Sequence, residues 1–183
     1  GRFIRELAKN QNQEVPPIEC YTATAKKDVV EDILAYFNRE TGTTLKLFEG
    51  GVDRGNLRFE VQAVPVQAKP ARILELIKER LGDDKDACGV VFRATRADTE
   101  ETARFLAEQG ISAKHFHAGL SVAEKKQVQD AFLEGELRVI CATNAFGMGV
   151  DKANIRLVIH GDTPSSIENY LQEAGRAGRD QKQ

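Results

Sequence analysis

Apolar and polar residues follow two regular patterns from residue 57 onward. Short, largely apolar segments predict strands over residues 57–64, 88–92, 111–116, 137–142 and 155–160. Apolar residues spaced three and four apart predict helices over residues 70–81, 98–110, 121–132 and 164–174. Asp98 with Glu101 and Ser121 with Glu124 have the spacing of capping boxes, which places two helix starts.

Strands that alternate with helices in this way imply βαβ units. The expected fold is therefore α/β, with three layers and a mostly parallel sheet flanked by helices. Ligands of such sheets bind beyond the carboxyl ends of the strands. We therefore expect function in the segments that follow Phe92, Phe116, Ala142 and His160.

The first 50 residues are less regular. An opening helix pattern is broken by Pro16-Pro17, and the segments after it predict a strand at 18–21, a helix at 26–39 and a strand at 45–48. Glycines at 50, 51 and 55 predict a domain boundary near residue 51. The abrupt patterns at both ends are typical of a piece cut from a longer chain.

Composition excludes several classes of protein. The 183 residues carry 26 Lys and Arg against 28 Asp and Glu, so the chain is not a strongly basic, free-standing nucleic-acid binder. No apolar run approaches the roughly 20 residues of a membrane span, so we expect no membrane partner. Cys20, Cys88 and Cys141 are too few and too far apart for a disulfide framework or a Cys-rich zinc site. We expect no metal site and buried thiols in a reducing compartment.

Two of the predicted strand ends carry groups suited to phosphate. Thr95 and Arg96 follow the strand at 88–92, and His117 follows the strand at 111–116. A hydroxyl, a guanidinium and an imidazole can each bind a phosphate of a nucleic-acid backbone. A helix cap at Thr95, a solvated Arg96 and a turn at His117 are the simpler alternatives.

The segment after Ala142 combines a hydroxyl, two glycines and an acid. Thr143 lies at the strand end, and Gly147 and Gly149 leave room for backbone N–H groups to approach a phosphate. Asp151 can accept a hydrogen bond from a ribose hydroxyl. A glycine-rich loop needed only for its turn is the alternative.

Two arginines close the chain. Arg176 and Arg179 are three residues apart, each after a glycine, and the guanidinium fork fits phosphate oxygens. No G-x-x-x-x-G-K-[ST] motif occurs, and no apolar strand ends in an Asp-Glu pair. The chain therefore has the parts of half a nucleotide site, without a phosphate loop or a pair of acids for Mg²⁺.

Taken together, these segments resemble the motifs of superfamily 2 helicases, most closely those of the RecQ DNA helicases. Residues 22–25, 91–96, 117–120, 142–152 and 172–180 resemble motif III, motif IV, the motif after the next strand, motif V and motif VI. Arg93 and Ala94 stand where Cys-Asn is common, and Ala153 where proline is usual. The resemblance implies a RecA-like fold, with residues 1–50 as the tail of a first lobe and 51–183 as the second lobe.

The resemblance also implies a mechanism, in which ATP binds between two lobes. The first lobe of the parent chain would supply the phosphate loop and the Mg²⁺ ligands, just before Gly1. Arg179 would be the arginine finger, Arg176 a second phosphate contact and Gln172 a positioning group. Asp151 would meet the ribose, with Gly147 and Gly149 close to the nucleotide.

DNA contacts are implied for Thr95, Arg96, His117 and Thr143, and coupling between nucleotide and DNA for Thr22 and Thr24. The parent would be an ATP-dependent DNA helicase with roles in repair and recombination, cytoplasmic in a bacterium or nuclear in a eukaryote. The piece alone would not hydrolyse ATP. An RNA-directed or other superfamily 2 motor and a non-enzymatic docking module remain open alternatives.

Overall fold

The computed structural model describes all residues except 1, 13, 15, 23–25, 49–53, 147–150 and 181–183. The chain divides into two compact units, one up to Asp53 and the other from Arg54. The boundary expected near residue 51 lies outside the described residues, and the assignment of the first unit to another lobe stays a prediction.

The first unit consists of a helix pair. Helices α1 (Arg2–Asn10) and α2 (Lys27–Thr41) lie side by side, and the Arg5 guanidinium donates to the carbonyl oxygen of Glu40 at 3.3 Å. Residues 18–21 and 45–48, all of them described, form no strand, so those two predictions are wrong. A segment of four residues gains strand structure only by pairing with a neighbour, and neither segment has one in the described part of this unit.

One parallel sheet organises the second unit. Strands β1 (Cys88–Phe92), β2 (Ala113–Phe116), β3 (Val139–Ala142) and β4 (Ile155–His160) are arranged in the order β2-β3-β1-β4. All three described strand pairs are parallel. The predicted α/β fold with a mostly parallel sheet is therefore confirmed.

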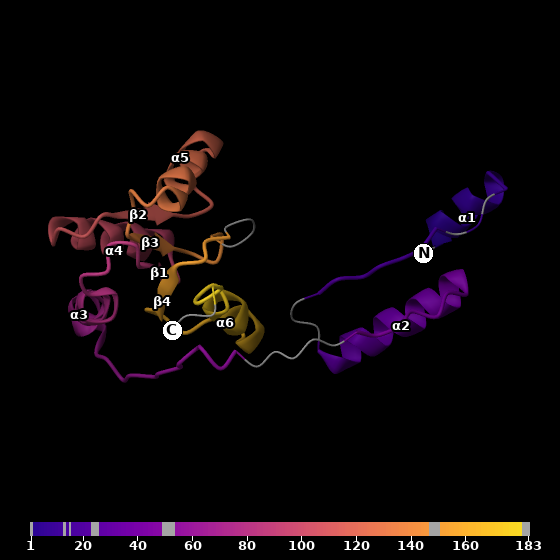
Figure 1. Cartoon of the computed structure of the whole chain (residues 1–183), viewed down its shortest axis with the longest axis horizontal. Coiled ribbons are helices and arrows are strands. Elements are labelled where there is room, and N and C mark those ends of the chain that lie inside the picture. Colours follow the sequence, from indigo (N-terminus) through magenta and orange to yellow (C-terminus); the bar gives the residue numbers. More distant parts are fainter. Residues whose placement is uncertain are drawn as a thin grey trace. The chain divides into compact units, whose positions relative to one another are not determined.

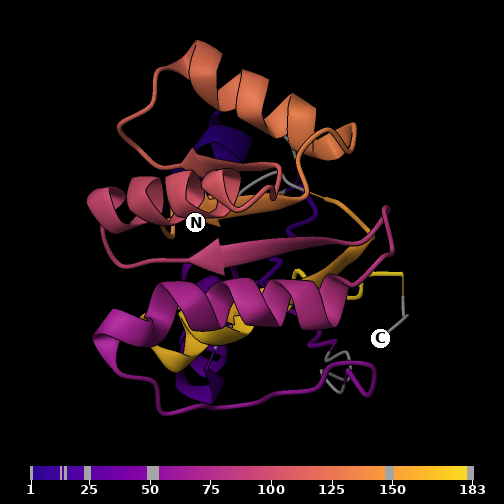
Figure 2. The same ribbon diagram turned by 90° about the vertical axis from the view of Figure 1, so that its left-hand side faces the viewer.

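Helices cover both faces of this sheet. Helices α3 (Lys69–Leu81) and α4 (Arg96–Glu108) lie on one face, in front of the strands in Figure 2. Helices α5 (Val122–Leu133) and α6 (Ile167–Ala174) lie on the other, as Figure 1 shows. Val90 and Phe92 point into the core below α5, whereas Val91 points into the core below α3 and α4. This alternation explains why β1 is apolar at every position.

The helix starts correct the sequence analysis in two places. Thr95, not Asp98, caps α4, because its hydroxyl accepts the N–H of Asp98 at 3.1 Å. Ser166 caps α6, which begins at Ile167 instead of at Pro164. The capping box of Ser121 and Glu124 at α5 is confirmed, with both hydrogen bonds present.

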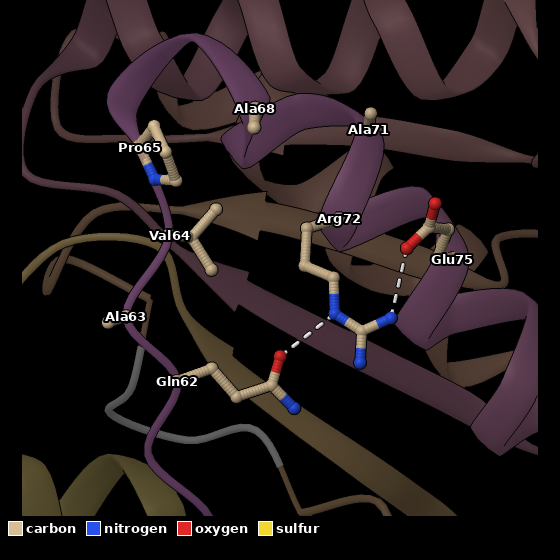
Figure 3. Close-up of a pocket in the computed structure, with 8 residues that line it drawn as sticks. All are labelled: Gln62, Ala63, Val64, Pro65, Ala68, Ala71, Arg72 and Glu75. Carbon is tan, nitrogen blue, oxygen red and sulfur yellow. Dashed lines mark hydrogen bonds and ion pairs between the residues drawn. The ribbon is translucent and has the colours of Figure 1, made fainter.

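Residues 57–64 are extended but form no strand, contrary to the prediction. Side chains hold this segment against α3, since the Arg72 guanidinium donates to Gln62 Oε1 at 2.8 Å and Arg80 pairs with Glu60 at 3.0 Å. Figure 3 shows Arg72 reaching Gln62 on one side and Glu75 on the other. The hollow beside it, about 310 Å³, contains none of the predicted site residues.

The cysteines give a direct test of this fold. Burial raises the pKa of the Cys88 thiol to about 11 and that of the Cys141 thiol to about 12, whereas Cys20 is exposed. Because the thiolate is the reactive form, we expect a disulfide reagent at pH 8 to modify one thiol rapidly in the folded chain and three after unfolding. Cys20→Ser should abolish the rapid phase, and two or more rapid thiols in the folded chain would contradict the described core.

Candidate functional site

The predicted site residues fall into two groups at opposite ends of the sheet. Thr95, Arg96, His117 and Thr143 follow strands β1, β2 and β3 directly, so they share the carboxyl edge. Asp151 precedes β4. The turn that carries Arg179 also lies at the amino end of β4, because the N–H of Gly178 donates to the carbonyl of Ile155 at 2.8 Å. Asp151 and Arg179 therefore lie at the opposite edge of the sheet from the four residues that directly follow strands β1, β2 and β3.

Arg179 and Asp151 bind each other. Arg179 Nη1 lies 2.6 Å from Asp151 Oδ1, and their side chains are 37% and 82% exposed. The two residues that were assigned separately to phosphate and to ribose are thus side by side and open to solvent. Gly147 and Gly149, predicted to lie near the same nucleotide, are outside the described residues.

Arg176 differs from Arg179 in its surroundings. It is buried, and its burial, followed by the positive charge of Arg179, lowers the pKa of its guanidinium. Glu173, one turn earlier, is also buried and binds His160 Nε2 at 2.8 Å. Gln172 is exposed on α6. Of the two predicted phosphate-binding arginines, only Arg179 offers part of its side chain to solvent in this state.

The turn at residues 175–180 is held by side chains that sequence reasoning did not single out. Arg54 donates to the carbonyl oxygens of Ala177 and Gly178 at 2.8 and 2.7 Å, and Asn56 donates to Gly178 at 2.8 Å. Arg156 binds both carboxylate oxygens of Asp180, at 2.8 and 2.5 Å. The turn that carries Arg179 is therefore fixed in place, and a fixed guanidinium loses less entropy when it binds an anion.

At the carboxyl edge, Thr95, Arg96 and His117 form a second group. Arg96 extends along the turn at Gly119, since a Cβ atom built there would lie 3.1 Å from Arg96 Nη1 and 3.1 Å from His117 Nδ1. The Thr95 hydroxyl accepts the N–H of Asp98 and donates to the Asp98 carboxylate at 2.6 Å. The cap considered for Thr95 is therefore present, and its hydroxyl is engaged in it.

Thr143 closes this group. Its N–H donates to the carbonyl of Phe116 at 3.2 Å, which places Thr143 beside the start of the His117 turn. The Thr143 hydroxyl accepts the N–H of Ala145 at 3.4 Å, a long bond that leaves its own proton for another acceptor. Thr22 of the other predicted pair is exposed, whereas Thr24 lies outside the described residues.

The described residues contain one group of potential metal ligands, Glu100, His115 and His117, whose donor atoms lie within 4.8 Å of one another. His117 Nδ1 accepts the N–H of Gly119 at 3.2 Å, so its proton is on Nε2 and points to Glu100 Oε1 at 2.9 Å. The adjacent His115 ring is stacked on it, and burial, then His117, lowers the His115 pKa. This tautomer fits a hydrogen-bond network better than a metal, which would need the Nε2 lone pair.

Among the described residues, no helix combines the length and apolar character needed to cross a bilayer.

Comparison with known proteins gives a consistent result. The family described as helicase conserved C-terminal domain matches residues 68–181. RecQ of Pasteurella multocida is 40% identical over 164 residues, which are 90% of this chain and 24% of that protein. A putative ATP-dependent DNA helicase Q1 of Caenorhabditis elegans is 38% identical over 90% of this chain and 25% of its own length. The chain thus spans about a quarter of the length of these two relatives.

Solved structures agree with this similarity. The helicase domain of Pyrococcus furiosus Hef is 30% identical, with a TM-score of 0.52, over 62% of this chain and 26% of that one. The DNA-bound helicase MrfA is 27% identical, with a TM-score of 0.53, over 61% of this chain and 15% of that one. The sequence motifs of this chain, its parallel sheet and these relatives agree: the chain belongs to the helicase conserved C-terminal domain family, its second unit has a RecA-like fold, and its sequence is similar to RecQ DNA helicases.

Proposed function

We propose that this lobe works within an ATP-dependent DNA helicase of RecQ type, in which ATP hydrolysis drives translocation and strand separation. The observation that carries the proposal is the contact of Asp151 with Arg179, which is exposed on a turn held by other side chains. The Arg179 guanidinium, which would bind phosphate, is hydrogen-bonded to the Asp151 carboxylate, which would bind ribose. One nucleotide bound at this place would therefore reach both groups.

The Arg179–Asp151 pair is suited to being opened by a nucleotide. Exposed ion pairs contribute only about 0–1 kcal/mol, so competing bonds to a ribose hydroxyl and to phosphate oxygens replace this one at little cost. Once released, the Arg179 guanidinium stabilises the negative charge that develops on the transferred phosphoryl group. Arg176 is buried in this structure, so Arg179 is the arginine that we assign to phosphate contact in this state.

Mg²⁺ would be held elsewhere. Mg²⁺ binds through one or two carboxylates together with substrate phosphates, and no predicted apolar strand of this sequence ends in an Asp-Glu pair. The residues of this chain therefore fit phosphate and sugar better than they fit the metal. We assign the phosphate loop and the Mg²⁺ ligands to the first lobe of the parent chain.

DNA would bind at the carboxyl edge of the sheet. Arg96 is exposed there, and the Thr143 hydroxyl keeps a proton to donate, so both can bind phosphate oxygens without reading bases. His117 would contribute only by exchanging its bond to Glu100 for one to phosphate. The relatives are named DNA helicases, which favours DNA over RNA as the nucleic acid that is bound. The exposed guanidinium of Arg179 favours a nucleotide-binding lobe over a module that only docks partners.

Replacing Arg179, the proposed arginine finger, should slow ATP hydrolysis without abolishing nucleotide binding. In the parent enzyme, Arg179→Ala should lower the DNA-stimulated ATPase rate by about 10³-fold, because arginine fingers contribute about 10³–10⁵ to turnover. ATP affinity, measured by a fluorescent nucleotide, should change by less than about tenfold. Arg104→Ala, which removes an exposed guanidinium from α4, is the matched control. Near-normal turnover in Arg179→Ala would refute the assignment.

The isolated chain should not hydrolyse ATP. It lacks a phosphate-loop motif, so a guanidinium alone has no bound triphosphate to act on. A phosphate-release assay with and without single-stranded DNA should give the same rate for the chain and for its Arg179→Ala variant. DNA-stimulated turnover that the Arg179→Ala change abolishes would show that the lobe needs no partner.

A further inference from the structure

Arg93 is a buried cation at the carboxyl end of β1. Its side chain is 10% exposed, and its guanidinium donates to Asp162 Oδ2 and to Thr102 Oγ1, both at 2.8 Å. Asp98 Oδ1 lies 3.8 Å from the same guanidinium. Arg93 therefore joins three elements: the end of β1, helix α4 and the segment after β4.

Asp162 is the centre of this network. Besides Arg93, it accepts from Lys69 Nζ at 2.8 Å and from the backbone N–H of Ala94 at 3.1 Å. Partial burial raises the pKa of this carboxyl, but the bonds from Lys69, Arg93 and Ala94 outweigh burial and hold the pKa at about 2. The carboxylate is charged at neutral pH, and it ties down the backbone of the loop that begins at Arg93.

Gly161 makes room for Arg93. A Cβ atom at position 161 would lie 2.7 Å from Arg93 Cδ and 3.1 Å from its Nε, closer than carbon atoms normally approach. The backbone of Gly161 is also fixed, because its N–H donates to the carbonyl of Phe92 at 2.9 Å. The arginine and the glycine therefore depend on each other, although 68 positions separate them.

We infer that Arg93, seated on Gly161 and Asp162, is a positioning residue for the Thr95–Arg96 loop. The inference deepens the proposed function and rests on it, since that loop is the proposed DNA contact. Arg93 fixes the loop from both ends, through Ala94 and Asp162 on one side and through Thr102 and Asp98 of α4 on the other. Arg93 itself is buried and acts on DNA only through the loop.

A double-mutant cycle in the 183-residue chain tests whether Arg93 and Gly161 depend on each other. Gly161→Ala alone should lower the thermal midpoint by about 4 °C or more, because the added methyl group overpacks against Arg93. In an Arg93→Ala background, the same change should cost no more than Gly55→Ala, whose added Cβ meets nothing within 4 Å. Equal costs of Gly161→Ala in both backgrounds would overturn the dependence of Arg93 on Gly161.

The second test measures DNA in the parent enzyme. Arg93→Ala should raise the half-saturating concentration of single-stranded DNA about tenfold, because a loop that is no longer held in place loses more entropy when it binds. The ATPase rate at saturating DNA should fall by less than about threefold, and Arg93→Lys should recover part of the DNA affinity. Arg104→Ala, which removes the same charge from an exposed site, should leave half-saturation unchanged.

The outcomes separate the two hypotheses. A DNA-stimulated wild-type enzyme whose half-saturation is unchanged by Arg93→Ala, or changed equally by Arg104→Ala, overturns the positioning role alone. A wild-type enzyme whose ATPase does not respond to DNA overturns the proposed function and the positioning role together. The double-mutant cycle, which measures thermal midpoints, tests the packing of Arg93 against Gly161 independently of helicase activity.

Discussion

The parallel pairing of β1 with β3 and β4, under helices on both faces, is the constraint on which the rest of the second unit depends. Burial on both faces requires apolar residues throughout β1, so the polar groups of the site stand beyond the strand ends. Because the strands are parallel, their carboxyl ends all lie at one edge of the sheet and their amino ends at the other. The separation between the Arg96 group and the Arg179 group follows directly from this geometry.

The segment between β3 and β4 connects the two edges. Thr143 leaves the carboxyl end of β3, and Asp151 stands just before the amino end of β4, so a single crossover carries one residue of each group. A nucleotide at one end and a nucleic acid at the other would therefore share one piece of backbone.

Local patterns predicted the core of the second unit and failed where structure depends on distant partners. The apolar run at residues 88–92 and the capping box at Ser121 are local signals, and the strand and the cap that they predict are both present. The strand expected at 57–64 is local in pattern, but a strand exists only through pairing, which the structure does not provide there. The N-cap of α4 is Thr95 and not the predicted Asp98. Both residue types suit an N-cap, and the two positions are only three residues apart, so the local sequence did not distinguish them.

The candidate site shows the same division. Motif spacing placed Arg179 and Asp151 in one nucleotide site, but no local signal indicated that they bind each other. The contacts of Arg54 with the Arg179 turn span more than 120 residues, and the contact of Arg93 with Asp162 spans 69. Of these residues, only Arg93 was marked in the sequence, as a departure from the family pattern.

Arg54 also bears on where this lobe begins. The family match starts at residue 68, close to the first residue of α3, yet Arg54 and Asn56 supply hydrogen bonds to the turn that presents Arg179. A lobe that began at residue 68 would keep the four strands of the sheet. It would lose the hydrogen bonds that Arg54 and Asn56 donate to the turn that carries Arg179. The hydrogen bonds that hold the Arg179 turn therefore come from residues up to 14 positions upstream of the segment that the family model matches.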